Sequence, residues 1–130
     1  IAARHKTLSY IDNVMARREA GRAGADMALI LDTDGCLSGT DCANLFWIRD
    51  GRLFTPSLAC GVLAGTVRAA LIAGLTVEQD GFAVSALDEA SCVFVTNALM
   101  GAVVVSELDG RPLGLGQGVP DEIKALLNGS

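Results

Sequence analysis

The first residue with a clear chemical use is Lys6, an amine near the start of the chain with Tyr10 four positions later. A lysine amine is a nucleophile only after losing its proton. A partly desolvated cleft lowers its pKa and favours reaction with an aldehyde. A lone lysine is more often a surface charge, because lysine is rarely buried. Lys6 is therefore a candidate only if other parts of the chain can hold an aldehyde near it.

Two turns have the composition of anion-binding sites. The segment 61–68, Gly-Val-Leu-Ala-Gly-Thr-Val-Arg, places glycine directly before an expected helix. Free backbone N–H groups and the positive end of a helix attract anions at such a point. The segment 96–101, Thr-Asn-Ala-Leu-Met-Gly, follows an expected strand and offers a hydroxyl, an amide and backbone N–H groups. Ordinary turn geometry explains either segment alone. Together with a reactive lysine, they suit a phosphate-bearing aldehyde cofactor.

Composition narrows the class of protein. A chain of 130 residues with 51% hydrophobic content is one domain with a sizeable core. The net charge of −5, without a basic stripe, argues against a nucleic-acid partner. No run of 18 apolar residues predicts a membrane span. Four scattered cysteines and a single histidine argue against a metal site and favour reduced thiols in a cytoplasmic protein.

Hydrophobic spacing and turn residues predict an α+β (mixed α/β) fold, a mixed sheet with helices packed on it. In the first half of the chain we expect a helix over 7–23, a strand over 27–35 ending in a Thr-Asp-Gly turn, a loop over 36–43 and a hairpin over 44–56 that turns at Asp50-Gly51. In the second half we expect a helix from about 66, a strand near 81–84 and a helical turn at 86–90. Strands over 92–96 and 102–107, joined by a turn, and a short helix that begins with Pro120 complete the expected order.

Five segments, taken in order, resemble the class IV (fold type IV) pyridoxal-phosphate enzymes, which include branched-chain aminotransferase, D-amino acid aminotransferase and aminodeoxychorismate lyase. The segments are KTLSYI from Lys6, ALILDTDG from Ala28, CANLFWIRDGRLFTP from Cys42, GVLAGTVR from Gly61 and VFVTNALMG from Val93. The resemblance runs from about residue 4 to 114. It implies that residues 1–130 form the large C-terminal domain, a mixed sheet or partial barrel that binds pyridoxal 5′-phosphate. We expect the small N-terminal domain, with a phosphate-gripping arginine, to be absent from this chain.

The resemblance assigns three residues around the cofactor ring. Lys6 matches the lysine that bonds the cofactor aldehyde and moves the substrate proton. Tyr10 falls near a tyrosine that hydrogen-bonds the phenolic oxygen of the cofactor in several members. Leu63 falls where a leucine packs against the pyridine face.

The resemblance also assigns the binding of the cofactor phosphate to the two turns at 61–68 and 96–101. Gly65 precedes Thr66 and Val67, which fall where two successive backbone N–H groups hold the phosphate. Many members have Ile-Thr there, so the hydroxyl of Thr66 is one place out of register. Asn97 and Ala98 match a second phosphate-binding turn that also faces the substrate, and Asn97 is the expected substrate contact. No metal is expected.

One departure from the family concerns the pyridine nitrogen. Members generally carry a glutamate five residues before the asparagine of N-L-F, where it keeps that nitrogen protonated. Counting back from Asn44 gives Gly39 in this chain. A carboxylate at this point makes the ring a better electron sink. Its loss implies slower carbanion formation unless Asp41 takes its place.

The resemblance implies an enzyme that acts on a small amino substrate, generally as a homodimer. The low charged content of 19% fits a surface partly covered by a second copy. N-A-L-M-G at 97–101 and A-N-L-F-W at 43–47 most resemble aminodeoxychorismate lyase, which releases pyruvate and para-aminobenzoate in folate biosynthesis. The alternatives are a class IV aminotransferase for branched-chain or D-amino acids, a catalytically impaired cofactor-binding relative, and an interaction module.

Overall fold

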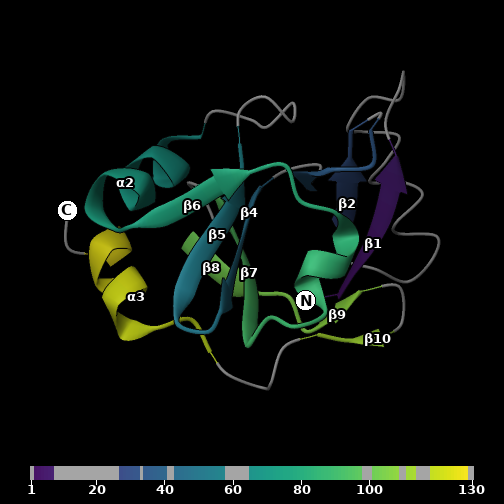
Figure 1. The fold of residues 1–130 in the computed structure, drawn as a ribbon. Helices are drawn as coiled ribbons and strands as arrows, with labels where there is room; N and C mark the ends of the chain where they lie inside the picture. The colour runs from purple at the N-terminus through teal and green to yellow at the C-terminus, as the bar shows by residue number, and fades with distance from the viewer. Residues whose placement is uncertain are drawn as a thin grey trace.

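The computed structural model describes residues 2–7, 27–32, 34–40, 43–57, 65–97, 101–108, 111–113 and 118–128. Within these residues the chain forms two five-stranded sheets and two α-helices (Figure 1). The α+β class predicted from the sequence is confirmed. The helices lie on one side of the molecule and the strands β1 and β2 on the other.

The first sheet has the strand order β10-β9-β1-β2-β3. Its centre is β1 (Ala2–Thr7), which pairs in parallel with β2 (Met27–Leu31) and with β9 (Glu107–Leu108). The outer strands β3 (Leu37–Thr40) and β10 (Arg111–Pro112) are antiparallel to their neighbours. The chain therefore returns near its end to complete the sheet that it starts.

The second sheet has the order β6-β5-β4-β7-β8. The strands are β4 (Asn44–Arg49), β5 (Arg52–Pro56), β6 (Val77–Asp80), β7 (Cys92–Asn97) and β8 (Gly101–Val104). All neighbouring pairs are antiparallel except β5 and β6. A parallel pair needs a crossover connection, and helix α2 lies within it.

Helices α2 (Thr66–Gly74) and α3 (Asp121–Asn128) pack against each other and against the second sheet. None of the described helices is long and apolar enough to cross a membrane. Pro120 precedes α3, and its carbonyl accepts the N–H groups of Ile123 and Lys124. Both helices were predicted from the sequence at these places.

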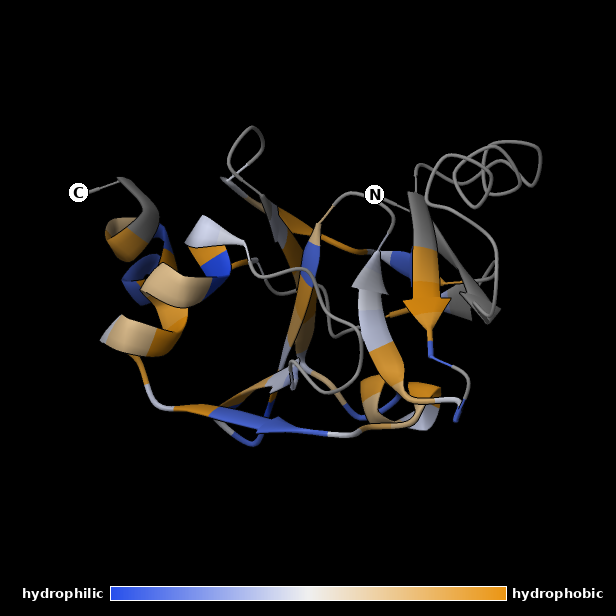
Figure 2. Ribbon diagram, turned by 90° about the horizontal axis from the view of Figure 1, so that it is seen from above, coloured by the Kyte–Doolittle hydropathy of each residue, from blue (hydrophilic) through white to orange (hydrophobic). Residues whose placement is uncertain are grey.

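The second sheet is covered on both faces, so its central strand is apolar on both sides. Along β4, Leu45 and Trp47 pack between the two sheets, whereas Phe46 and Ile48 pack toward the helices. Successive side chains of a strand point to opposite faces, which explains this division. Figure 2 shows hydrophobic residues both in the strands and in the helices beside them. The continuous apolar run at 45–48 therefore reflects two separate cores.

The predicted hairpin at 44–56 is confirmed. Asp50 and Gly51 have φ values of +51° and +75°, the pattern of a type I′ turn. Behind the turn, Trp47 stacks on Phe54 at 5.9 Å between ring centroids and meets Phe82 edge-on at 5.0 Å. These rings join the hairpin to the segment that follows β6.

Two predictions near the start of the chain were wrong. Thr7 belongs to β1, so the helix expected from this residue does not begin there; residues 8–26 lie outside the described part. The segment Leu37–Thr40, expected as a loop, is strand β3. Its four residues, Leu-Ser-Gly-Thr, are all buried, and the strand is held by pairing with β2 across 29–31. Neither β1 nor β3 has an alternating pattern of apolar and polar residues.

Three further boundaries were also wrong. The strand expected at 81–84 lies at Val77–Asp80, a polar segment that is a strand because it pairs with β5. The helical turn expected at 86–90 is a 3-10 turn over Val84–Leu87. The strand expected over 102–107 divides between the two sheets, with β8 in one and β9 in the other. Strands β6 and β9 are fixed by partners distant in sequence, whereas the 3-10 turn is held by local bonds from the N–H groups of Ala86 and Asp88 to the carbonyls of Ala83 and Ser85.

Candidate functional site

A group of buried polar residues lies where the second sheet meets the start of α2. Asn44 is the first residue of β4, and Thr96 is paired with it on β7. Opposite residues of an antiparallel pair share one face of the sheet. Asn44 is 5% exposed and Thr96 is fully buried. The β4–β7 register therefore places an amide and a hydroxyl side by side beneath the surface.

Gly65 brings the start of α2 against this pair. It is the N-cap residue, with φ −73° and ψ 152°, and its carbonyl accepts the N–H group of Ala69. A Cβ atom built on Gly65 would lie 2.5 Å from Oδ1 of Asn44. A side chain at position 65 would therefore require the Asn44 amide or the start of α2 to move. The absence of a Cβ, rather than an unusual φ, is what glycine provides here.

The first turn of α2 lacks the groups that usually satisfy a helix N-terminus. Gly65 offers no side-chain cap, and the first turn contains no acidic residue. The first turn of α3, by contrast, contains Asp121 and Glu122. The opening N–H groups of a helix have no partner within the helix and carry a partial positive charge. The start of α2, which includes Thr66 and Val67, can therefore accept an external anion.

The Thr96 hydroxyl is an unsatisfied polar group in this cluster. Its Oγ1 atom is buried and has no hydrogen-bond partner. The other fully buried threonine of the same sheet, Thr55, donates to the carbonyl of Leu45 at 2.7 Å. A buried polar group without a partner costs about 1–3 kcal/mol.

Helix α2 itself carries a buried, positively charged side chain. Arg68 is 5% exposed, and its Nη2 atom donates to the carbonyl of Pro56 at 3.2 Å and to Oε1 of Gln79 at 2.9 Å. Its Nε atom has no partner, and Arg68 forms no ion pair with the described carboxylates. Burial lowers the pKa of the Arg68 guanidinium, but arginine stays protonated in proteins. No described carboxylate therefore neutralises the positive charge of Arg68, which belongs to the first turn of α2.

The backbone of Lys6 lies in β1, in the first sheet. The register pairs Lys6 with Ile30 of β2 and Ile30 with Gly39 of β3. One row of register positions therefore joins the predicted nucleophile to the position where the family glutamate is missing. Gly39 has φ +144°, and an added Cβ would meet the carbonyl oxygen of Ala43 at 3.2 Å. A glutamate could enter this strand only with a change of backbone.

The other predicted site residues are placed only in part. Gly65, Thr66 and Val67 lie together at the start of α2. Asn97 ends β7, directly after Thr96, and is paired with Gly101, which has φ +68°. Tyr10, Leu63, Ala98 and Asp41 lie outside the described residues, so their roles stay predictions.

Two residues of this group had no assigned role in the sequence interpretation: Asn44 and Arg68. Asn44 served there only as a landmark for counting back to Gly39, whereas Thr96 was named as the hydroxyl of the anion-binding turn 96–101. Their burial and pairing come from strand register, for which the sequence gives no direct signal. In the described part of the chain no group of three or more His, Cys, Asp or Glu side chains could hold a metal.

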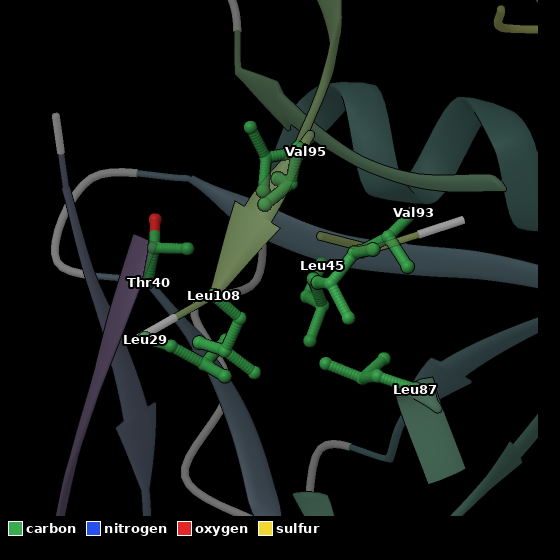
Figure 3. A pocket seen from close by; sticks show the side chains of 9 residues that line it. Leu29, Thr40, Leu45, Leu87, Val93, Val95 and Leu108 are labelled. Carbon is green, nitrogen blue, oxygen red and sulfur yellow. The ribbon is translucent and has the colours of Figure 1, made fainter. Parts of the chain in front are cut away.

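The space between the two sheets is a different kind of feature. Figure 3 shows side chains that converge on it, most of them leucine and valine. The single polar residue of this lining is Thr40, which donates from Oγ1 to the Ala43 carbonyl at 3.2 Å and accepts the Ala43 N–H at 2.9 Å. The space measures about 10 Å³, which is at the lower limit for one water molecule. It is a packing gap, too small for a substrate.

Comparison with known proteins points to one family. The family model described as amino-transferase class IV matches residues 1–108. A putative branched-chain-amino-acid aminotransferase of Methanocaldococcus jannaschii is 32% identical over 82% of this chain and 38% of its own length. An aminodeoxychorismate lyase of Vibrio harveyi is 31% identical over 82% of this chain and 41% of its own length. The chain thus spans less than half the length of the curated relatives that it matches.

Solved structures agree with this result. The structure of a putative 4-amino-4-deoxychorismate lyase from Legionella pneumophila has a TM-score of 0.85 and 29% identity, and the match covers 99% of this chain and 56% of that one. An aminotransferase from Brucella abortus, bound to the cofactor PLP, has a TM-score of 0.82 and 25% identity over 96% of this chain and 52% of its own. These folds confirm the predicted resemblance to the fold type IV enzymes.

Proposed function

Because the chain belongs to the amino-transferase class IV family, we propose that it is the pyridoxal-phosphate-binding part of an aminodeoxychorismate lyase. The lyase converts 4-amino-4-deoxychorismate into pyruvate and para-aminobenzoate. Relatives at about 30% identity include this lyase and branched-chain aminotransferases alike. The preference for the lyase rests on N-A-L-M-G at 97–101, where aminotransferases tend to have S/T-G-T.

The observation that carries the cofactor assignment is the buried anion site at the start of α2. The Asn44 amide lies where a side chain at position 65 would be, so the start of α2 packs directly against it, and the Thr96 hydroxyl has no partner within the protein. A phosphate group fits these features because its oxygens accept hydrogen bonds and carry negative charge. The backbone N–H groups of Thr66 and Val67 would hold it. When bound, pyridoxal phosphate supplies a conjugated electron sink for the substrate amine.

The remaining roles follow from the chemistry that such a reaction needs. Lys6 would hold the cofactor at its aldehyde carbon, and its amine would take and return the substrate proton as a general acid–base group. Tyr10 and Leu63 orient the ring, and Asn97 with Ala98 faces the substrate. We propose a cytoplasmic homodimer, in line with the family.

The test of Lys6 uses the fact that the chain has two lysines, Lys6 and Lys124. Lys124 is exposed on α3 and provides a matched control. With added pyridoxal phosphate, the wild-type protein and Lys124→Ala should show the visible absorbance of the lysine adduct, and Lys6→Ala should lose it. Borohydride reduction and peptide mapping should label Lys6. A band retained in Lys6→Ala would refute the assignment.

A second assay separates the two activities. Release of pyruvate from 4-amino-4-deoxychorismate without an amino acceptor supports the lyase. Turnover of branched-chain or D-amino acids that depends on 2-oxoglutarate supports an aminotransferase instead. Lysine labelling at Lys6 without either activity supports an impaired relative, and Gly39 in place of the family glutamate gives a physical reason for it.

A further inference from the structure

We propose that the Ser38 hydroxyl of β3 donates a hydrogen bond to the ring nitrogen of the bound cofactor and keeps that nitrogen unprotonated. The inference rests on the proposed function and concerns a part of the cofactor other than its phosphate. It makes Ser38 a cofactor-binding residue at a point where the chain has no carboxylate.

A β-bulge brings Ser38 beside the position that Gly39 leaves without a side chain. From the pair 31–37 to the pair 30–39, β3 advances two residues while β2 advances one. The additional residue is Ser38, so Ser38 and Gly39 both lie opposite Ile30. Ser38 therefore supplies the one side chain of the bulge.

The Ser38 side chain belongs to the face of the first sheet that points away from the second sheet. The preceding Leu37 lies in the core between the two sheets, and successive side chains of a strand point to opposite faces. After the bulge, Thr40 again lines the space between the sheets. Both neighbours of Ile30 in β2 belong to that core, and Ile30 does not. Ser38 and Ile30 therefore share one face.

The backbone of Lys6 lies in the same register row. Lys6 of β1 is paired with Ile30 of β2, so β2 separates it from the bulge in β3. Two strand spacings measure about 9.5 Å, a span comparable with a pyridine ring that has a bonded nitrogen at one end and a hydrogen bond at the other. In pyridoxal phosphate the ring nitrogen lies directly opposite the carbon that bears the aldehyde. When Lys6 holds the aldehyde, a residue of the bulge is thus placed for the nitrogen.

The Ser38 hydroxyl is accessible and is not used within the described part of the protein. The other hydroxyl of β3, that of Thr40, donates to the Ala43 carbonyl at 3.2 Å. The Ser38 hydroxyl has no hydrogen-bond partner among the described residues, and it is not one of the two polar atoms there that are sealed from solvent without a partner. Ser38 is 9% exposed, whereas Thr96 is fully buried. A group outside the sheet can therefore reach Oγ of Ser38.

The charges around the bulge favour a neutral nitrogen. Strands β2 and β3 contain no acidic residue. Asp32, which follows β2, accepts the N–H groups of Asp34 and Cys36 at its Oδ1 atom, both at 2.9 Å. A protonated nitrogen in a desolvated site needs a negative charge beside it. A serine hydroxyl offers a donor without that charge, so it stabilises the unprotonated form.

The test observes the ring nitrogen directly. Pyridoxal 5′-phosphate, isotope-labelled at that nitrogen, is bound to the full-length protein, and its NMR chemical shift distinguishes protonated, hydrogen-bonded and free nitrogen. The wild-type protein should give the shift of a hydrogen-bonded neutral nitrogen, and Ser38→Ala that of a free one. Ser38→Asp should give a protonated nitrogen, because the bulge then carries a carboxylate. Ser91→Ala, which removes a hydroxyl that donates to the Ile48 carbonyl, is the control and should leave the shift unchanged.

Affinity separates a contact with the nitrogen from a packing effect. Ser38→Ala should weaken binding of pyridoxal 5′-phosphate by roughly 2- to 10-fold, the range for a hydrogen bond between uncharged groups. The analogue in which carbon replaces the ring nitrogen should bind to the wild-type protein and to Ser38→Ala equally. If the alanine variant does not fold, Ser38→Cys, which has nearly the same shape and a weaker donor, makes the same comparison.

A protonated nitrogen in the wild-type protein would overturn the inference, and so would an unchanged nitrogen signal in Ser38→Ala. An equal loss of affinity for the cofactor and for the carbon analogue would assign Ser38 a structural role alone. Asp41→Asn tests the competing partner, because a signal that changes in this variant and not in Ser38→Ala assigns the nitrogen to Asp41. Borohydride labelling of Lys6 alongside any of these results would retain the proposed function and remove only Ser38. A wild-type protein that does not bind the cofactor would contradict both.

Discussion

The two faces of the second sheet differ in how completely they are satisfied. Toward the first sheet, Trp47, Phe54 and Phe82 interlock, and the polar Thr40 exchanges hydrogen bonds with Ala43. Toward the helices, the apolar cluster ends in polar groups beside the start of α2, and both buried side-chain atoms without partners, in the described residues, belong to Thr96 and to a residue of α2. One face is a fully satisfied core, and the other keeps two buried polar atoms without hydrogen-bond partners among the described residues.

The difference between the two faces separates residues that stabilise the fold from residues that are candidates for ligand binding. Burial of apolar surface stabilises the fold whichever ligand is present. Unpartnered donors in a buried place lower stability and are retained for a use outside folding. Changes on the first face should therefore affect unfolding, and changes at the end of the second should affect binding.

The largest expected effect is a loss of stability, caused by a change on the face that packs against the first sheet. Trp47→Ala removes a side chain that is 1% exposed and stacked on Phe54. We expect a loss of about 3–5 kcal/mol in the free energy of unfolding, measured by chemical denaturation. Trp47→Phe should lose less. Phosphate affinity should be unchanged while the variant is folded, and a selective loss of affinity would break the comparison.

A change at the other face should affect binding more than stability. Gly65→Ala places a Cβ 2.5 Å from Oδ1 of Asn44, so the helix start or the amide must move. We expect a loss of about 1–3 kcal/mol in stability and a larger loss in phosphate affinity, measured by calorimetric titration. Gly118→Ala, with nothing within 4 Å of the added atom, is the control. Equal affinity in Gly65→Ala would remove this glycine from the site.

The buried cation sharpens the comparison further. Arg68→Gln removes the positive charge. Arg68→Lys keeps the charge but loses the Nη2 group that donates to the Pro56 carbonyl and to Oε1 of Gln79. If the charge supports binding, Gln should weaken phosphate affinity by about tenfold, which is ~1.4 kcal/mol, and Lys should weaken it much less. Affinity should be compared at low and high salt. Equal effects of both variants would assign Arg68 a structural role alone.

The smallest effect concerns a thiol in the helix-facing core. Cys92 is 2% exposed, and burial raises its pKa above the usual value of 9.0. The folded protein therefore keeps its proton at a pH where the unfolded chain loses it. Stability from this group is full below pH 9 and is lost as the pH rises toward the folded pKa, by about 1 kcal/mol per pH unit at most. Urea unfolding between pH 8 and 10 measures the slope, which Cys92→Ala should reduce; an unchanged slope would assign it to other groups.

Elements with strong local signals were predictable from the sequence. The Asp50-Gly51 hairpin has its own turn chemistry, and the helices 66–74 and 121–128 have glycine or proline at their starts. The strands β1 and β3 were not predicted and β6 was misplaced by four residues, because each is held by pairing with another strand rather than by its own pattern. The division of 101–108 between two sheets has the same cause.

The candidate site also contains some residues that the sequence predicts and others that only the tertiary structure brings together. Gly65, Thr66 and Val67 could be chosen from the sequence, because a glycine before a helix is a local feature with a known attraction for anions. The absence of a carboxylate at position 39 also follows from the sequence. Only the register of β4 and β7 placed Asn44 against Thr96, and only the packing of α2 brought Gly65 to them. A hydroxyl becomes an unpartnered donor through what surrounds it, and that depends on segments that are far apart in the chain.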